Sequence, residues 1–181
     1  MYFVPIHIML NRILATSLYA AILLVNTSFH FRDVVPGYLV VVDKDSYELY
    51  VFDQKGWLAT YPCVFGSKDL GDKMVEGDRK TPEGIYHIVS KSKSKKWNSF
   101  FMLDYPTPAD IEKFNQRKSQ GLIPATAKIG SAIGIHGTWP HEDYTIDQYQ
   151  SWTDGCIALK NKDVEELYQM LDVGTEVIIR K

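Results

Sequence analysis

The stretch SWTDGCIAL, residues 151–159, places Cys156 directly after Gly155, where a polar run gives way to an apolar one. The chain has two cysteines, and this thiol has four candidate roles: a packed core residue, half of a disulfide, a metal ligand or a nucleophile. A thiol with a pKa near ~8.5 is mostly protonated at neutral pH, so it needs a nearby base, usually a histidine, to attack a carbonyl. Composition alone favours a packed cysteine.

The chain has five histidines: His7, His30, His87, His136 and His141. The first two belong to the amino-terminal segment, and the third alternates within a strand-like run. His136 ends the apolar run SAIGIHG and precedes Gly137, so its ring can emerge uncrowded at a strand end. Gly155 similarly allows a sharp turn beside Cys156 and exposes amides that could stabilise an oxyanion. His136, His141 and Cys156 could also bind a metal, but they lack a fourth ligand and the tight spacing of structural zinc sites, so we expect neither metal nor cofactor.

Three motifs follow one another along the chain: GDRKTPEGIY at 77–86, IGIHG at 133–137 and TDGCIAL at 153–159. Together they resemble the L,D-transpeptidase catalytic domain, also called the YkuD domain, and the resemblance spans about residues 37–180. The signature of that family is a histidine, a spacer, Ser or Thr, a second histidine, Gly and Cys. His136 fills the first position, Thr153 the Ser/Thr position, and Gly155 and Cys156 the last two.

The resemblance implies a mainly β domain, sandwich-like or barrel-like, with a few short helices. It also implies that Cys156 is the nucleophile and that His136 is the proton donor and acceptor. The thiol would form a thioester acyl-enzyme with a peptidoglycan tetrapeptide stem, and an amine of a second stem would take the acyl group to form a cell-wall cross-link. Donor and acceptor stem peptides are therefore the expected partners.

Four further residues are implied around this pair: the backbone of Asp154 and Gly155 at the oxyanion, and Thr138 and Thr153 as orienting hydroxyls. Two positions depart from the family pattern. Asp154 replaces the second histidine, and its charge would oppose thiolate formation unless it points away or pairs with a cation. Ala158 stands where many members carry Arg or Asn, which alters the region where the acceptor is chosen. Two alternatives stay open: a peptidoglycan hydrolase of the L,D-carboxypeptidase or endopeptidase type with the same dyad, and a catalytically silent wall-binding domain.

The elements that must position these residues are mostly strands. Runs rich in β-branched and aromatic residues predict strands at 37–43, 47–53, 57–66, 84–90, 97–104, 131–137 and 175–180. Helical spacing predicts helices at 109–118 and 161–171, the second capped by Asn161. The polar, glycine-rich passage at 66–86 predicts either a binding loop or a solvated connection.

Three other features were weighed from the sequence. The basic run at Lys91, Lys93, Lys95 and Lys96 favours a solvated strand edge over a site for an anionic wall polymer. Cys63 lies in an apolar context, so we expect it to be buried and free. Trp139 and Trp152 flank the two motifs and could line a pocket or pack in the core.

The amino terminus is a separate unit. Residues 13–29 carry no charge and follow Arg12, which predicts that residues 1–30 are an export signal or a membrane anchor, with a buried core helix as the alternative. The remainder, 37–181, is expected to be one catalytic domain in the periplasm or cell envelope. The formal net charge of −2 gives no basic surface of the kind that nucleic-acid binding requires, so no nucleic-acid partner is expected.

Overall fold

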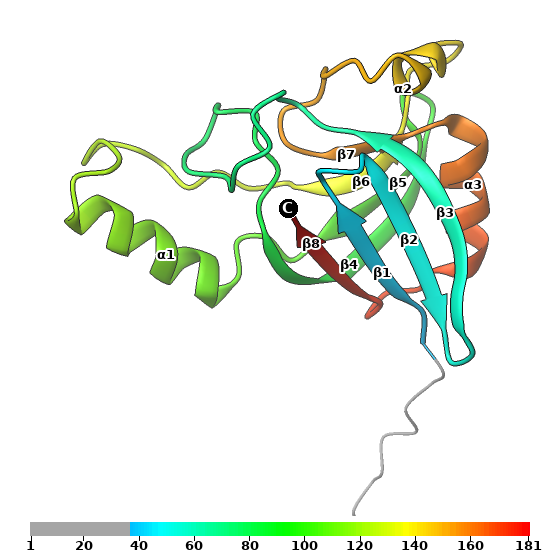
Figure 1. Ribbon diagram of the computed structural model, residues 1–181, viewed down its shortest axis with the longest axis horizontal. Coiled ribbons are helices and arrows are strands. Elements are labelled where there is room, and N and C mark those ends of the chain that lie inside the picture. Colours follow the sequence, from blue (N-terminus) through cyan, green and yellow to red (C-terminus); the bar gives the residue numbers. More distant parts are fainter. Residues whose placement is uncertain (1–36) are drawn as a thin grey trace, which may run out of the picture. The chain divides into compact units, whose positions relative to one another are not determined.

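A computed structural model of the protein describes residues 37–181. Eight strands close into a barrel in the order β1-β2-β3-β7-β6-β5-β4-β8, which confirms the mainly β, barrel-like prediction (Figure 1). The strands are β1 (Leu39–Asp43), β2 (Glu48–Asp53), β3 (Gly56–Val64), β4 (Gly84–Ser94), β5 (Asn98–Leu103), β6 (Gly134–Gly137), β7 (Ile157–Leu159) and β8 (Glu176–Arg180). The helices are α1 (Pro108–Ser119), α2 (Tyr144–Asp147) and α3 (Asn161–Met170).

Alternation along the strands builds the barrel interior. In β1 the side chains of Val40 and Val42 are buried between partly exposed neighbours, and in β2 Leu49 and Val51 follow the same period. Successive side chains of a strand point to opposite faces, so each strand sends one set inward and the other outward. The outward set is therefore available for a site or for covering helices.

Two neighbouring pairs of strands are parallel: β1 with β8, and β6 with β7. Parallel strands cannot be joined by a tight hairpin, and the chain between β6 and β7 accordingly makes a long crossover, residues 138–156, that contains α2. Strand β7 has only three residues, too few for a period to be read from the sequence, and it was not predicted. It nevertheless places Cys156 directly before a buried strand.

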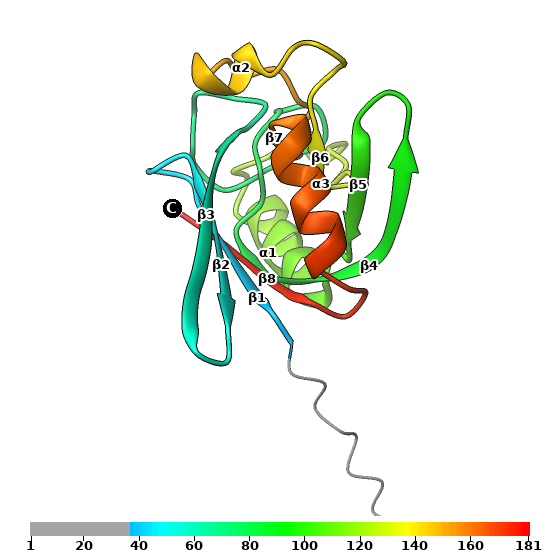
Figure 2. The same cartoon turned by 90° about the vertical axis from the view of Figure 1, so that its right-hand side faces the viewer.

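Helix α3 packs against β5 and β6, and its buried residues join the core cluster formed by the inward-facing strand side chains (Figure 2). Its apolar face, including Val164 and Leu167, is buried as the spacing predicted. The predicted cap was wrong: Asn161 is the first helical residue, and its amide donates to Oδ1 of Asp143 from the crossover at 2.9 Å. A residue distant in sequence thus caps the helix, which no local pattern indicates.

The passage between β3 and β4 is tied down by buried, charged side chains. Lys44, whose side chain is 1% exposed, pairs with Glu83 at 2.7 Å and donates to the carbonyl of Thr81 at 3.3 Å. Lys73 is also buried and pairs with Asp78 at 2.8 Å. Buried charges are tolerated when they are paired and hydrogen-bonded, so the Lys44 contacts fix the passage to the barrel and the Lys73–Asp78 pair stabilises the passage itself.

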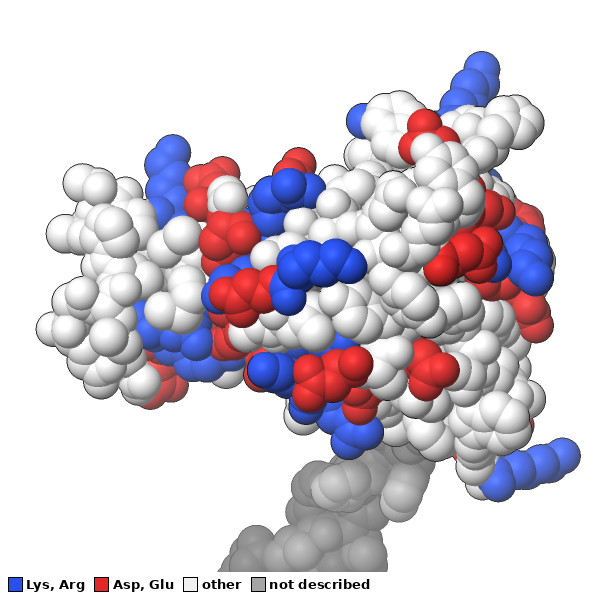
Figure 3. Space-filling view, turned by 45° about the horizontal axis from the view of Figure 1, so that its top comes forward, with Lys and Arg blue, Asp and Glu red and all other residues white. Residues whose placement is uncertain are grey.

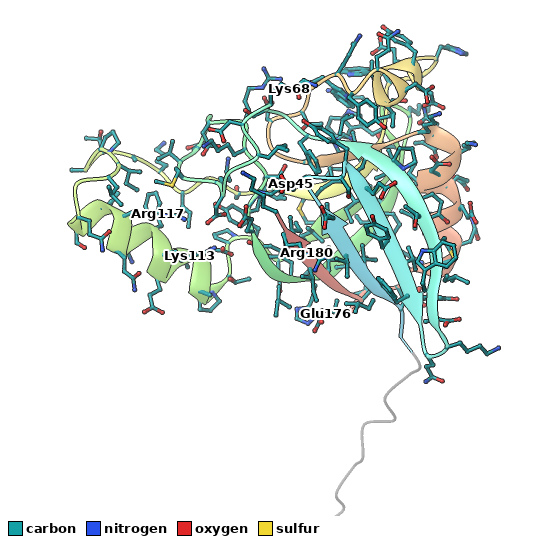
Figure 4. All side chains as sticks on the ribbon, in the orientation of Figure 1. Asp45, Lys68, Lys113, Arg117, Glu176 and Arg180 are labelled. Atoms are coloured by element: carbon teal, nitrogen blue, oxygen red, sulfur yellow. The ribbon has the colours of Figure 1, made fainter. Side chains whose placement is uncertain are left out.

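Helix α1 secures the other side of the same passage. A capping box between Thr107 and Asp110 starts the helix, and Lys113 and Arg117 project from it to reach Asp72 at 3.2 and 2.6 Å (Figure 4). Two cations on one carboxylate hold the passage at a defined position, and they lower the pKa of Asp72 against the opposing effect of its burial.

The predicted export signal or membrane anchor at 1–30 lies outside the described residues. Within 37–181, no helix has the length and apolar character needed to cross a membrane.

Candidate active site

The two residues singled out by the sequence lie on one face of the barrel wall, where β5, β6 and β7 run side by side. His136 is in register with Phe100 of β5 and with Ala158 of β7. Cys156 lies two residues before Ala158, so strand alternation directs it to the same face as His136. The intervening Ile157 points into the barrel core.

A pocket of about 830 Å³ opens at this face. That volume is within the range of small-molecule and peptide-substrate sites. The residues that line it are Ser92, Lys93, Ser94, Lys96, Trp97, Phe100, Met102, Ser131, Ala132, His136, Trp139, Trp152, Thr153, Asp154 and Cys156. His136 and Cys156 therefore share one cavity.

The ring of His136 is held in one tautomer. Its Nδ1 lies 2.7 Å from the carbonyl oxygen of Gly137, and because a carbonyl can only accept, Nδ1 carries the proton. The lone pair of the neutral ring is then on Nε2. The prediction that Thr138 orients this ring is corrected, because its hydroxyl donates to Asp143 at 2.5 Å and accepts from Asn161 at 2.8 Å. The orienting group is a backbone carbonyl.

Aromatic side chains enclose the imidazole, which is 3% exposed. Phe100 stacks on it with centroids 5.7 Å apart and planes 7° apart, and the rings of Trp97 and Trp152 lie at 5.2 and 5.4 Å. This burial lowers the pKa of His136, the Gly137 hydrogen bond opposes the change, and the charge of Lys96 reinforces it. The ring is therefore neutral at pH 7 and can act as a base.

The thiol of Cys156 is half-buried and also uncharged at rest. Its Sγ lies 3.5 Å from the carbonyl oxygen of Ala132. Burial raises the pKa of Cys156 to about 11, the charge of Asp154 adds to the rise, and the backbone at Gly134 and the charge of Lys73 oppose it. A neutral thiol beside a neutral imidazole requires proton transfer as the sulfur attacks.

The turn that carries Cys156 is closed by its own threonine. Thr153 Oγ1 donates to the carbonyl of Cys156 at 2.8 Å and accepts from the amide of Gly155 at 3.2 Å. Gly155 has φ of +122°, and a Cβ there would lie 2.7 Å from the carbonyl oxygen of Lys80, so both the conformation and the space require glycine. The amide of Gly155 is used within the turn, which corrects the expectation that it faces an oxyanion.

The passage after β3 braces this turn from behind. Thr81 Oγ1 donates to the carbonyl of Gly155 at 2.9 Å, and Arg79 Nε donates to the carbonyl of Thr153 at 3.1 Å. Thr81 belongs to the TPEG part of the motif at 77–86, and no pattern in the sequence indicates a role for its hydroxyl. The contact joins that motif to the turn that carries the cysteine.

Other residues considered from the sequence lie elsewhere. Cys63 is buried in the barrel core, where burial raises its pKa, and both cysteines are free. His141 is exposed and does not line the pocket. Over residues 37–181, no group of three or more His, Cys, Asp and Glu side chains is arranged to hold a metal ion.

Comparison with known proteins defines the family. The sequence model of the L,D-transpeptidase catalytic domain (YkuD) matches residues 37–179, which is most of the chain and all of the barrel except Arg180. The chain belongs to the L,D-transpeptidase (YkuD) family. A putative L,D-transpeptidase encoded in the ATP synthase region of Fuscovulum blasticum is 33% identical over 107 residues, covering 55% of this chain and 51% of that protein. The putative L,D-transpeptidase YqjB of Bacillus subtilis is 28% identical over 144 residues, covering 77% of this chain and 69% of that protein.

Solved structures show the same fold. The helical cell shape determining protein Pgp2 of Campylobacter jejuni superposes with a TM-score of 0.59 at 28% identity, covering 80% of this chain and 48% of Pgp2. Bd1075 of Bdellovibrio bacteriovorus superposes with a TM-score of 0.57 at 22% identity, covering 80% of this chain and 47% of Bd1075. This chain thus spans about half the length of the Fuscovulum relative and of both solved structures.

The two departures from the L,D-transpeptidase pattern have separate structural settings. The side chain of Asp154 is 99% exposed, and its Oδ1 lies 3.9 Å from Nε of Arg79, so a cation is nearby, yet its charge still contributes to the raised pKa of Cys156. Ala158 is fully buried and packs with Val64, Ile146 and Trp152 under the crossover. This packing fills the position, so a larger polar side chain would displace α2.

Several pocket residues of this L,D-transpeptidase were not assigned to the site from sequence. Trp97 and Phe100 were read only as part of a strand, although their aromatic spacing in WNSFF was a usable signal. Trp139 and Trp152 both line the pocket, and Trp152 in addition packs against the buried Ala158. Lys93 and Lys96 also line it, so the basic run is more than a solvated strand edge.

Proposed function

We propose that this protein is a peptidoglycan L,D-transpeptidase in which Cys156 is the nucleophile and His136 the general base and acid. The observation that supports this most directly is the placement of both side chains on one face of the β6-β7 pair, within one pocket. The stem peptides that the L,D-transpeptidase family joins are exported cell-wall components, so we also propose that the enzyme works in the cell envelope, with residues 1–30 directing it there.

The first half-reaction is acylation. His136 Nε2 takes the thiol proton of Cys156 as the sulfur bonds to the carbonyl carbon of the third stem residue. The carbonyl becomes an oxyanion, for which the amides of Asp154 and Cys156 are the proposed donors, since the Gly155 amide is used by Thr153. The C–N bond to the terminal D-alanine then breaks, His136 returns the proton to the leaving amine, and a thioester remains.

The second half-reaction is transfer. An amine of another stem attacks the thioester carbonyl and gives a proton to His136, and the C–S bond breaks as the sulfur regains a proton. One peptide bond has been broken and one formed, so the number of peptide bonds is unchanged and no external energy source is required.

The test uses the purified full chain and defined tetrapeptide muropeptides, with product masses as the readout. We expect dimers whose mass is the sum of two monomers minus one D-alanine. Cys156→Ala should give no product and no covalent adduct with a carbapenem-type acylating agent. The matched control, Cys63→Ala, changes a thiol in the barrel core and should still form the adduct.

The other outcomes of the experiment are equally specific. A shortened monomer without dimer would mean that water replaces the amine and that the protein is a hydrolase. Absence of both products, together with no adduct in a folded wild-type protein, would show a non-catalytic wall-binding domain. Product formation by Cys156→Ala would refute the nucleophile assignment.

A further inference from the structure

Lys96 occupies a distinctive place at the pocket. Its Nζ lies 4.4 Å from the ring centroid of Trp97 and 4.3 Å from that of Trp139, so the ammonium is held between two indole faces. Both tryptophans and Lys96 line the pocket that contains His136 and Cys156. Cation–π contacts position an ammonium without neutralising its charge, because the ring supplies only a quadrupole.

The neighbouring lysines of the basic run are used differently. Lys91 pairs with Asp172 at 2.9 Å and donates to the carbonyl of Leu171 at the end of α3 at 2.8 Å. Lys93 lines the pocket but is ion-paired with Glu165. Their charges are therefore already matched by acceptors of the protein.

No such carboxylate accompanies Lys96. Throughout residues 37–181, no Asp or Glu oxygen lies within 4.0 Å of its Nζ. On the face seen in Figure 3 several basic side chains lie next to acidic ones, and others project alone. The anionic side chain among the pocket-lining residues, Asp154, is on the turn of the nucleophile. The positive end of the pocket is thus the Trp97–Trp139 wall, and it is suited to an incoming anion.

We propose that Lys96, held between Trp97 and Trp139, binds a carboxylate of the donor stem peptide and selects donors that carry it. This inference rests on the proposed function and adds a specificity-determining residue to it. A tetrapeptide donor has a terminal carboxylate one residue beyond the scissile carbonyl. A dicarboxylic diamino acid at the third position would provide a second carboxylate, on the side chain of the residue that is attacked.

Two features favour this role over simple packing. A lysine side chain loses considerable rotamer freedom when it binds a ligand, and the two indole rings restrict that freedom in advance. The Lys96 charge also contributes to the lowered pKa of His136, which indicates that its field extends to the catalytic pair. A carboxylate bound there would partly cancel that field when the donor is in place.

The test compares three donor peptides in full-length protein carrying Cys156→Ala, so that binding is measured without turnover. The peptides are the free acid, the terminal carboxamide and the form amidated on the side-chain carboxylate of the third residue. We expect Lys96→Gln to raise the Kd of the free acid about tenfold or more, as for loss of a charge-assisted hydrogen bond. The peptide whose Kd no longer responds to Lys96→Gln identifies which carboxylate is bound.

Two control variants complete the design. Lys95→Gln removes the same charge one residue away, outside the pocket lining, and should leave every Kd unchanged. Lys96→Arg keeps the cation and should restore most of the affinity for the free acid. Turnover of the same peptides by the protein with Cys156 intact should show a higher KM in Lys96→Gln with little change in kcat.

Equal weakening of acid and amide peptides by Lys96→Gln would show that Lys96 only supports the tryptophan wall, and an unchanged Kd would also overturn the inference. If turnover proceeds while Lys96→Gln has no effect, only this inference fails. If no peptide binds to Cys156→Ala and none is turned over with Cys156 intact, the inference and the proposed function fail together.

Discussion

The protonation state of the Cys156–His136 pair makes the sharpest prediction, because the structure places both groups in their neutral forms. The pKa of His136 lies below its usual value and that of Cys156 is raised to about 11. As pH rises, the imidazole therefore loses its proton first, and the thiol loses its proton only far above neutrality. A thiolate–imidazolium pair would titrate in the opposite order.

The magnitude follows from the thiolate fraction. At pH 7.5 a pKa of about 11 leaves about 0.03% thiolate, against about 10% for an ordinary cysteine of pKa ~8.5. The thiolate fraction of Cys156 is thus ~300-fold lower than that of an ordinary cysteine. Each thiolate reacts about 13-fold faster, because thiolate nucleophilicity rises with pKa with a Brønsted slope of about 0.45. Alkylation of Cys156 by iodoacetamide should therefore be about 20-fold slower than that of a free cysteine derivative.

The assay is the alkylation rate of the full chain between pH 5 and 9.5, followed by intact mass, with Cys156→Ala to show that buried Cys63 does not react. We expect the rate to rise about tenfold per pH unit without a plateau. Turnover should behave differently: it should rise with pH only through the lowered pKa of His136 and then stay level. His136→Gln should reduce turnover by about 10²–10⁴ but change alkylation above pH 9 very little. A plateau of fast alkylation between pH 5 and 8 would refute the neutral-pair reasoning.

Two further predictions concern the passage that contacts the catalytic turn. Thr81→Val leaves the buried carbonyl of Gly155 without its donor, which costs about 1–3 kcal/mol and should lower kcat/KM about tenfold by displacing Cys156. Thr81→Ser keeps the hydroxyl and should restore kcat/KM, so equal activity of the two variants would contradict a positioning role. Glu83→Gln leaves the buried charge of Lys44 without its partner. Because Glu83 is partly exposed, we expect the free energy of unfolding in chemical denaturation to fall by about 2 kcal/mol, less than the roughly 3–5 kcal/mol found for fully buried pairs. A loss under about 0.5 kcal/mol, the range of ordinary surface substitutions, would show that this pair does not fix the passage.

Local patterns predicted much of the framework, because strand and helix periods are properties of neighbouring residues. The runs at 37–43 and 47–53 alternate, and they form β1 and β2 within one or two residues of the predicted bounds. The apolar spacing at 161–171 likewise predicted α3. The cap of α3 escaped prediction because Asp143, which accepts the Asn161 amide, belongs to a separate segment.

Residue types and their spacing were enough to identify the reactive groups: a cysteine after a glycine, a histidine at a strand end, and motifs typical of one family. How these groups are held depends on the folding of the whole chain. Barrel closure brings β5 beside β6, so that Phe100 stacks on His136, and it sets Thr81 against the turn of Cys156. Contacts of this kind join segments far apart in the chain, and they depend on register and closure, which the period of a single segment does not encode.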